Sequence, residues 1–353
     1  MRIMLDLNFY KDKRVLITGH TGFKGAWLSR ILINAGARVT GYSLQPPTSP
    51  SLFEAADIAE GMNSVIADVR DFDKMKAVFD EAQPEIVFHL AAQPIVLTSY
   101  EQPKYTYETN VMGTVNLLEC VRLCPSVKSV LNVTTDKVYE NNESGTPMKE
   151  GEPLDGFDPY SNSKSCSELV THSYKRSFFD KAGIAVSTAR AGNVIGGGDF
   201  ADNRIIPDCV RAATAGKNVI IRNPNSVRPY QHVLEPLYVY LMIAAAQYND
   251  FSYAGYYNVG PNESDCLTTG ELATYFCNSW GNSQGYEVLN KEGPHEANFL
   301  RLDCTKLKTV FDWQPKWNAK TAVEKTVEWT KVWAAGGNCK VKLDEQINEF
   351  FLV

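Results

Sequence analysis

The sequence lacks the features of several protein classes. No apolar run approaches the roughly 18 residues that a membrane-spanning helix needs. The opening MRIMLDLNFY contains Asp6 and Asn8 and has no apolar stretch, so we expect no secretory signal and a cytoplasmic location. The five histidines do not stand at metal-ligand spacing, so we expect no metal site. The eight cysteines are scattered without a C-x-x-C pair, which favours reduced thiols over a disulfide framework.

Basic charge is also scarce. Lysine and arginine number 35 against 41 acidic residues, a net charge of −6, which argues against non-specific binding to nucleic acid or to anionic membranes. What is present is an ordinary globular composition, 44% hydrophobic and 22% charged. A chain of 353 residues predicts two domains, or one large α/β domain with an appendage.

Strand patterns alternate with helical patterns in the first half of the chain. Strands are predicted at 14–18, 38–43, 85–92, 129–135 and 184–190, and helices at 23–35, 71–82, 107–124 and 160–181. This alternation predicts an α/β fold, a Rossmann-type doubly wound parallel sheet with helices on both faces. The alternation stops near Asn193. We therefore expect a dinucleotide-binding domain at 1–193 and a smaller, irregular, mainly substrate-binding domain at 194–353. The regions near Val219 and Tyr256 are candidates to return strands to the main sheet.

A glycine turn follows the first predicted strand and opens the first predicted helix. Its glycines stand three residues apart, at 19, 22 and 25. Glycine lets the backbone approach a diphosphate, and the helix N-terminus offers unpaired N–H groups and a positive dipole end. The turn therefore predicts a dinucleotide site, and a tight turn without a ligand is the alternative. No acidic residue ends the second strand, at Gly41-Tyr-Ser-Leu-Gln45, so these residues leave NAD and NADP both open.

Two further motifs carry candidate chemistry. Tyr160-Ser-Asn-Ser-Lys164 places a phenol and an ammonium one helical turn apart, and a nearby cation favours the phenolate form of a base. A similar spacing from Tyr100 to Lys104 contains a proline, so we reject it. A structural alternative is that Glu168, four residues on, pairs with Lys164.

The other motif, Thr134-Thr-Asp-Lys137, ends a predicted strand, where open α/β sheets place their chemistry. A hydroxyl, an acid and a base together suit an elimination reaction. The alternative is a polar loop after a buried strand.

The same motifs carry a family resemblance. Thr18-Gly-His-Thr-Gly-Phe-Lys-Gly25 resembles the nucleotide-binding turn of the extended short-chain dehydrogenase/reductase family. Val133-Thr-Thr-Asp-Lys-Val-Tyr139 is similar to the Ser/Thr-Thr-Asp-Glu-Val-Tyr signature of its nucleotide-sugar 4,6-dehydratases. Lys137 departs from the usual glutamate, and the Asp–Lys pair resembles that of the dehydratases that act on CDP-glucose. The resemblance extends from about Lys13 to Trp317 and includes the segments 89–94, 107–114, 190–199 and 228–236.

The resemblance implies removal of water across C5–C6 of a nucleotide hexose, an early step towards the deoxy- and dideoxyhexoses of surface polysaccharide. Bound NAD would take a hydride from C4 and return it to C6, and the C4 ketone would acidify the C5 proton. Tyr160 would take the C4 hydroxyl proton, with Thr134 hydrogen-bonding to it. Asp136 would protonate the departing C6 hydroxyl. Lys137 would take the C5 proton as an uncharged amine, its pKa lowered by burial and by Lys164 or the nicotinamide.

The resemblance also implies binding residues. The cofactor set is Gly19, His20, Thr21, Gly22, Phe23, Lys24, Gly25, Asp68, Val69, Leu90, Ala91, Ala92, Tyr160, Lys164 and Arg190. The substrate set is Gln93, Thr134, Asn193, Arg204, Arg228, Tyr230, His295, Asn298 and Arg301. Guanidinium groups suit a diphosphate, although each arginine could instead form a surface ion pair, and Asp68 could be an ordinary loop carboxylate.

The expected assembly is a homodimer or a dimer of dimers that buries helices 107–124 and 160–181. Two alternative functions remain open at this point. A 4-epimerase or reductase of the same family would keep the glycine turn and the Tyr160–Lys164 pair without needing Asp136 and Lys137. A non-catalytic dinucleotide-sensing protein would commonly lose the Tyr–Lys pair.

Overall fold

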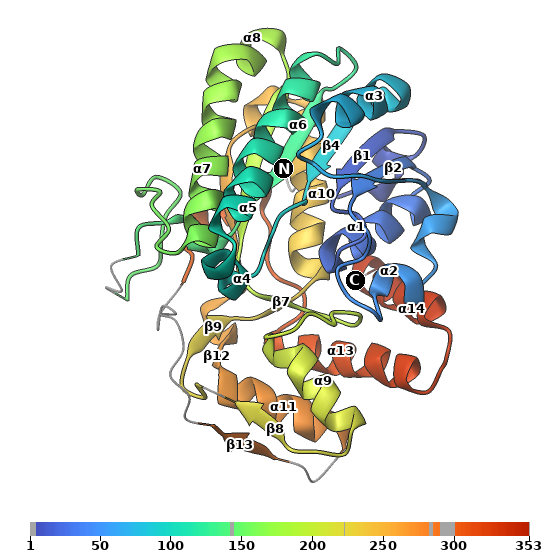
Figure 1. Cartoon of the computed structure of the whole chain (residues 1–353), viewed down its shortest axis with the longest axis vertical. Coiled ribbons are helices and arrows are strands. Elements are labelled where there is room, and N and C mark those ends of the chain that lie inside the picture. Colours follow the sequence, from blue (N-terminus) through green and yellow to red (C-terminus); the bar gives the residue numbers. More distant parts are fainter. Residues whose placement is uncertain (1–4, 142–144, 222, 282–284, 290–300, 353) are drawn as a thin grey trace.

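The computed structural model describes residues 5–141, 145–221, 223–281, 285–289 and 301–352 (Figure 1). Its main feature is a seven-stranded sheet in the order β11-β6-β5-β4-β1-β2-β3, in which every neighbouring pair is parallel. The strands are β1 Arg14–Thr18, β2 Arg38–Ser43, β3 Asn63–Ile66, β4 Ile86–His89, β5 Ser129–Val133, β6 Ala185–Ala191 and β11 Tyr256–Val259. The predicted doubly wound α/β fold is confirmed.

Helices cover both faces of this sheet because successive strand residues point to opposite sides. In β1, Val15 and Ile17 join the core beneath α1 (Phe23–Asn34) and α10 (Leu234–Asn249). Leu16 joins the opposite core, beneath α3 (Phe72–Ala82) and α6 (Gly113–Arg122). Helix α7 (Pro159–Tyr174) packs beside α6 on that second face (Figure 1).

The two long helices expected on this face are each interrupted. The first is divided into α5 (Pro103–Tyr107), a π-helical segment at Glu108–Met112, and α6. The second continues from α7 through a π-helical segment at Lys175–Phe179 into α8 (Asp180–Ala182). A further helix, α4 (Val96–Glu101), precedes α5. Pro103 begins α5, so Tyr100 and Lys104 belong to different helices and do not form a pair on one helix face.

The second half of the chain forms a smaller lobe. Helices α9, α11 and α13 pack together there around Val219, Phe276 and Val323 (Figure 1). Its helices are α9 Ile205–Thr214, α11 Thr269–Trp280 and α13 Ala319–Ala334, whereas α12 Thr305–Phe311 packs against β11 in the core of the first lobe. Its short strands are β7 Val194–Ile195, β8 Val219–Ile221, β9 Val227–Pro229, β10 Gln231–His232, β12 Cys266–Thr268 and β13 Tyr286–Val288. They form the two-stranded pairs β10-β7, β12-β9 and β13-β8.

Parts of the second half nevertheless complete the first lobe. The Tyr256 region returns β11 to the main sheet, whereas the Val219 region, β8, pairs with β13 instead. The last helix, α14 (Cys339–Leu352), buries Leu343 and Phe350 in the same core as α1. The ends of the chain outside the family resemblance therefore still contribute to the Rossmann-type core. Among the helices described, none is long and apolar enough to span a membrane.

Candidate active site

The glycine turn lies at the point where the strand order reverses, between β1 and β4. Gly19 has a φ of 80°, and a Cβ there would lie 2.7 Å from the Ala91 nitrogen. A Cβ on Gly25 would lie 2.0 Å from the Gly19 oxygen, so both glycines are needed for the turn to pack. A Cβ on Gly22 would instead meet, among the described atoms, only the Gly19 oxygen at 3.4 Å.

Gly22 is also the N-cap of α1 and provides no side-chain cap. The first N–H groups of the helix therefore face a space that a Cβ at this position would enter. This open cradle at a helix N-terminus fits the diphosphate of a dinucleotide. Phe23 and Lys24 form the first helical positions beside it.

The other residues of the turn support it from behind. The Thr21 hydroxyl donates to the Leu44 carbonyl at 2.8 Å, which fastens the turn to the end of β2. His20 is buried with Nε2 2.7 Å from Ser64 Oγ, and its ring occupies the space above Gly41. Burial lowers the pKa of His20 to about 4, so the ring is neutral. The His20 side chain therefore packs between the turn and β2.

The remaining expected cofactor residues follow the ends of β3 and β4. Leu90, Ala91 and Ala92 come directly after β4, where the backbone of the first two lies against Gly19. Val69 is buried against Gly113. The Asp68 carboxylate accepts hydrogen bonds from the Arg70 side chain at 2.7 to 3.1 Å. A role for Asp68 in binding adenine stays a prediction.

An acid and an amine meet in the turn after β5. Thr135 N-caps the short 3₁₀ helix Asp136–Val138 and donates its hydroxyl proton to Asp136 Oδ1 at 3.0 Å. Lys137 Nζ donates to the same oxygen, also at 3.0 Å. The second Asp136 oxygen, Oδ2, is buried and has no hydrogen-bond partner among the described residues. A Cβ on Gly192 would lie 3.0 Å from Asp136 Oδ2, so glycine at this position keeps a side chain away from that oxygen.

The charge state of Lys137 corrects the sequence-based expectation. Burial alone would lower the pKa of Lys137, but the Asp136 carboxylate and Tyr160 outweigh it, and the pKa is raised above the usual value. The expected uncharged amine is therefore wrong for this resting arrangement. Lys137 and Asp136 form an ion pair.

Tyr160 lies in the first turn of α7 and faces this pair. Asp158 N-caps the helix by accepting from the Ser161 N–H at 3.0 Å, and Pro159 occupies the first helical position. Burial raises the pKa of Tyr160, while the Lys137 cation and a hydrogen bond with Thr135 oppose the rise.

Lys164 lies one turn further along α7 and donates to the Val133 carbonyl at 3.1 Å. Burial lowers the pKa of Lys164 to about 8. Lys137 and Arg204 are the cations that oppose the rise in the pKa of Tyr160, and a role for Lys164 beside the phenol stays a prediction.

Thr134 does not occupy its predicted place. Its hydroxyl donates to Glu168 Oε1 at 2.5 Å, whereas Thr135 bonds to Tyr160. Consecutive residues at a strand end point to opposite sides, so only one of the two threonines can face the phenol. The assignment of Thr134 as the partner of Tyr160 and as a substrate contact is wrong in this structure. The alternating direction of successive side chains along β5 is the sequence signal that could have distinguished the two threonines.

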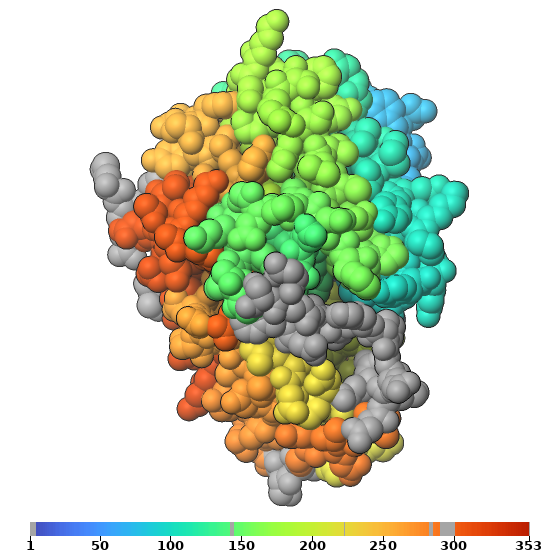
Figure 2. Space-filling model, turned by 90° about the vertical axis from the view of Figure 1, so that its left-hand side faces the viewer, coloured from blue at the N-terminus to red at the C-terminus, as the bar shows by residue number. Residues whose placement is uncertain are grey.

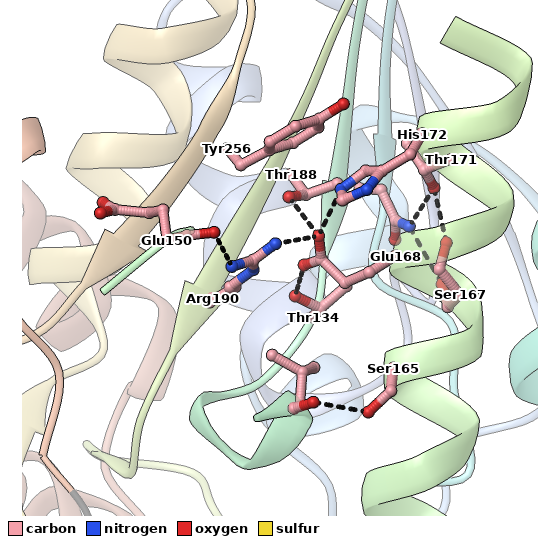
Figure 3. Close-up of polar contacts among 12 residues, drawn as sticks. Thr134, Glu150, Ser165, Ser167, Glu168, Thr171, His172, Thr188, Arg190 and Tyr256 are labelled. Atoms are coloured by element: carbon pink, nitrogen blue, oxygen red, sulfur yellow. Dashed lines mark hydrogen bonds and ion pairs between the residues drawn. The ribbon is translucent and has the colours of Figure 1, made fainter. Parts of the chain in front are cut away.

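Arg190 is a second correction. It was expected to bind the cofactor, but its side chain is fully buried. The guanidinium donates to Glu168 Oε2 at 2.9 Å and to the Glu150 carbonyl at 3.0 Å (Figure 3). It also donates to the Tyr139 hydroxyl at 2.8 Å. Glu168 forms its 2.9 Å ion pair with Arg190, and its carboxylate also opposes the lowering of the pKa of Lys164. Sequence reasoning identified neither this pair nor Thr135.

Several cations converge on the centre from both lobes. Lys24, in the first turn of α1, has its pKa lowered to about 8 by burial and by Arg204, while Asp136 opposes the shift. Arg204 is the residue before α9, and its Nη1 lies 3.0 Å from Asp199 Oδ2. Arg228 in β9 is buried and close enough to Lys137 to influence its pKa. Figure 2 shows the second lobe, in yellow and orange, below the green surface of the first lobe.

The other expected substrate residues lie in different surroundings. The Gln93 amide donates to Thr106 Oγ1 at 2.9 Å and accepts from the Ile95 N–H at 2.6 Å, and its substrate role stays a prediction. The Asn193 carbonyl accepts from the Gln231 N–H at 3.3 Å, and Tyr230 is buried in the second-lobe core. Arg301 forms an ion pair with Glu263. His295 and Asn298 lie outside the described residues.

A Rossmann-type sheet, an open glycine cradle and a Tyr–Lys helix beside an Asp–Lys turn define the class as a dinucleotide-binding α/β protein of the short-chain dehydrogenase/reductase type. A family model described as GDP-mannose 4,6 dehydratase matches residues 16–326. The chain is 45% identical to a CDP-glucose 4,6-dehydratase of Salmonella typhimurium, over 98% of each sequence. The chain belongs to this family of nucleotide-sugar 4,6-dehydratases.

Solved structures agree on the fold. A UDP-glucose 4-epimerase of Thermus thermophilus, in complex with NAD, superposes with a TM-score of 0.78 at 25% identity, covering 90% of this chain and 98% of that one. A dTDP-glucose 4,6-dehydratase of Bacillus anthracis, also in complex with NAD, superposes with a TM-score of 0.75 at 22% identity, covering 90% of this chain and 96% of that one.

Proposed function

We propose that this chain is an NAD-dependent hydro-lyase that converts CDP-glucose to CDP-4-keto-6-deoxy-glucose and water. The observation that carries the proposal is the ion pair of buried Asp136 with partly buried Lys137 beside Tyr160, at the end of a central strand. An epimerase or reductase has no step that requires an acid and an amine placed together there. The Salmonella typhimurium relative named for this reaction supports the choice of cytidine nucleotide.

NAD fits the glycine cradle at α1, and when bound it accepts a hydride from C4 and later supplies one to C6. Residues Gly19 to Gly25 would hold its diphosphate through the backbone. Lys164, with its ammonium group beneath the strand end, would contact the nicotinamide ribose. The NAD complexes of the T. thermophilus and B. anthracis proteins support NAD over NADP.

Tyr160 would accept the C4 hydroxyl proton, and the Thr135 hydroxyl, which donates to Asp136 Oδ1 in the resting pair, would turn to donate to the phenolate. The elimination needs Lys137 neutral, to take the C5 proton, and Asp136 protonated, to release the C6 hydroxyl as water. The resting ion pair differs from this reactive form by one proton, which can cross the 3.0 Å bond from Lys137 Nζ to Asp136 Oδ1. Taking the C5 proton and giving up the acid proton returns the pair to the ionic form.

Lys24, Arg204 and Arg228 would hold the nucleotide diphosphate. Their positive charges approach the centre from both lobes, which supports substrate binding between residues 1–193 and the lobe built mainly from 194–353. Guanidinium groups match the geometry of phosphate oxygens.

The proposed assembly is a homodimer, or a dimer of dimers, formed through the outer helices near α6 and α7. Exposed apolar side chains on this face support it: Tyr100, Met112, Leu169 and Phe178. The eight free cysteines support a reducing cytoplasm. Light scattering of the purified protein and of Leu169→Glu tests the assembly, because the variant should shift the protein to the monomer.

The experiment that tests the function is incubation of purified, NAD-supplied protein with CDP-, dTDP-, UDP- and GDP-hexoses, followed by mass spectrometry. Loss of one water from CDP-glucose is the expected result. An unchanged mass with a changed sugar configuration would identify an epimerase instead. The double variant Asp136→Asn/Lys137→Ala is the matched control, since it keeps the cradle and Tyr160 but removes the elimination pair.

A further inference from the structure

The buried carboxylate of Glu168 is the meeting point of three elements (Figure 3). Its Oε1 accepts from Thr134 Oγ1 at 2.5 Å, at the end of β5. Its Oε2 accepts from Thr188 Oγ1 at 2.7 Å and from Arg190 Nη2 at 2.9 Å, both in β6. Glu168 itself lies on α7 and is fully buried. One side chain therefore fastens α7 to two central strands.

Two of these three elements, α7 and the end of β5, carry the proposed chemistry. Helix α7 holds Tyr160 and Lys164, and Lys164 is one turn from Glu168 on the same face. Thr134 immediately precedes Thr135, Asp136 and Lys137. The bonds of Glu168 thus join the helix of the oxidation pair to the turn of the elimination pair.

We propose that Glu168 is a positioning residue: its carboxylate sets α7 against the Thr135–Lys137 turn and supplies the anion beside Lys164. The inference rests on the proposed function and deepens it, because Tyr160 and Lys137 must act on neighbouring carbons of one sugar.

The role has a geometric part and an electrostatic part, which two variants separate. Thr134→Val removes the link to the β5 turn but keeps the carboxylate and its pairing with Arg190. Glu168→Gln keeps the shape and an acceptor oxygen but removes the negative charge. The groups that face Lys164 are then His89 from β4, which is neutral because burial lowers its pKa to about 3, and Lys24 from α1, which repels it.

Thr134→Val should lower kcat about tenfold, with little change in KM and an unmoved alkaline limb of the kcat–pH profile. Glu168→Gln should lower kcat by about 10- to 100-fold and move the alkaline limb down by about one pH unit, because Lys164 loses its anion. In protein with ¹³C-labelled lysine, the NMR titration of Lys164 should shift down by a similar amount. This last readout does not depend on turnover.

Gln247 provides the matched control. It bridges β5 and β6, donating to Ser129 Oγ at 2.8 Å at the start of β5 and accepting from Ser187 Oγ at 2.5 Å in β6. Gln247→Met should lower the melting temperature but leave kcat per folded molecule and the Lys164 titration unchanged.

The proposal is overturned if Glu168→Gln behaves like Gln247→Met, with a lower melting temperature and a wild-type titration and kcat. If Glu168→Gln does not fold, Thr134→Val decides, and a wild-type kcat in that variant overturns the proposal. Failure of the proposed function is separate, because the wild type itself would then release no dehydrated product, while the Lys164 titration would still report the coupling to Glu168.

Discussion

Lys137 Nζ lies 3.0 Å from Asp136 Oδ1, while the other Asp136 oxygen is buried and, within the described structure, has no hydrogen-bond partner. One oxygen of the Asp136 carboxylate is therefore hydrogen-bonded to Lys137, and the other has no hydrogen bond from a described residue. A C6 hydroxyl that enters this centre would find an acceptor that no described residue already occupies. The same contact gives the lysine a direct path for the proton that it must lose before it can act as a base.

Lys137→Ala should abolish exchange of the C5 proton with deuterated solvent together with turnover, because it removes the amine bonded to Asp136. Proton NMR of the sugar in deuterated buffer measures the exchange. Asp136→Asn is the companion variant, and it should retain some C5 exchange while loss of the C6 hydroxyl slows. Wild-type exchange in Lys137→Ala would assign the base to another group.

Thr135→Val should lower kcat and move the acid limb of its pH profile to higher pH. The Thr135 hydrogen bond favours the phenolate, so its loss raises the pKa of Tyr160 further. Tyr160→Phe should lose about 10²–10⁴-fold in kcat while substrate still binds, as measured by titration calorimetry. An acid limb at the same pH in Thr135→Val as in the wild type would contradict the assignment of this threonine.

Much of the fold could be predicted because strand and helix periodicity is local. The β1, β2 and β6 segments and the start of α1 lie within a residue of their predicted positions. The glycine turn and the Tyr160–Lys164 spacing are also local, since each motif spans one turn or one helical repeat.

The errors arise where tertiary packing decides. Thr134 and Thr135 are chemically identical, and only the pairing of β5 with its neighbours determines which one faces Tyr160. The sign of the Lys137 pKa shift depends on the contact with Asp136, which outweighs burial. Arg190 carries a charge that suits a cofactor, yet Glu168 from a distant helix neutralises it in the core.

Gly22→Val should abolish NAD binding while leaving the fold intact. Gly22 has extended backbone, with φ −75° and ψ 167°, which a β-branched residue also adopts, and its side chain would enter the cradle. Gly25→Ala is the contrasting control, because a Cβ there would collide with the Gly19 carbonyl at 2.0 Å and should lower the melting temperature. NAD affinity by calorimetry and thermal melting separate the two effects. Unchanged NAD affinity in Gly22→Val would show that NAD does not bind at this turn.

Ionisation of Glu235 should lower the free energy of unfolding as the pH rises. It lies fully buried at the start of α10, where Oε1 accepts from the Lys316 and Trp317 N–H groups at 2.8 and 2.6 Å. Burial raises the pKa of Glu235 to about 7, above the value of 4.5 in an unfolded chain, although the two N–H groups oppose the rise. The neutral carboxyl therefore contributes stability that is fully present below about pH 4.5 and is lost as the pH rises through about 7.

Glu235→Gln keeps an acceptor oxygen for the two N–H groups but cannot ionise. Relative to this variant, the wild type should lose about 3 kcal/mol of unfolding free energy between pH 4.5 and pH 8, the size expected for a shift of this order in a buried group. Urea denaturation of both proteins across that range measures the difference, and the other titrating groups cancel in the comparison. Unfolding free energies that run parallel with pH would mean that Glu235 is ionised in the folded protein throughout, with its charge satisfied by the N–H groups of residues 316 and 317.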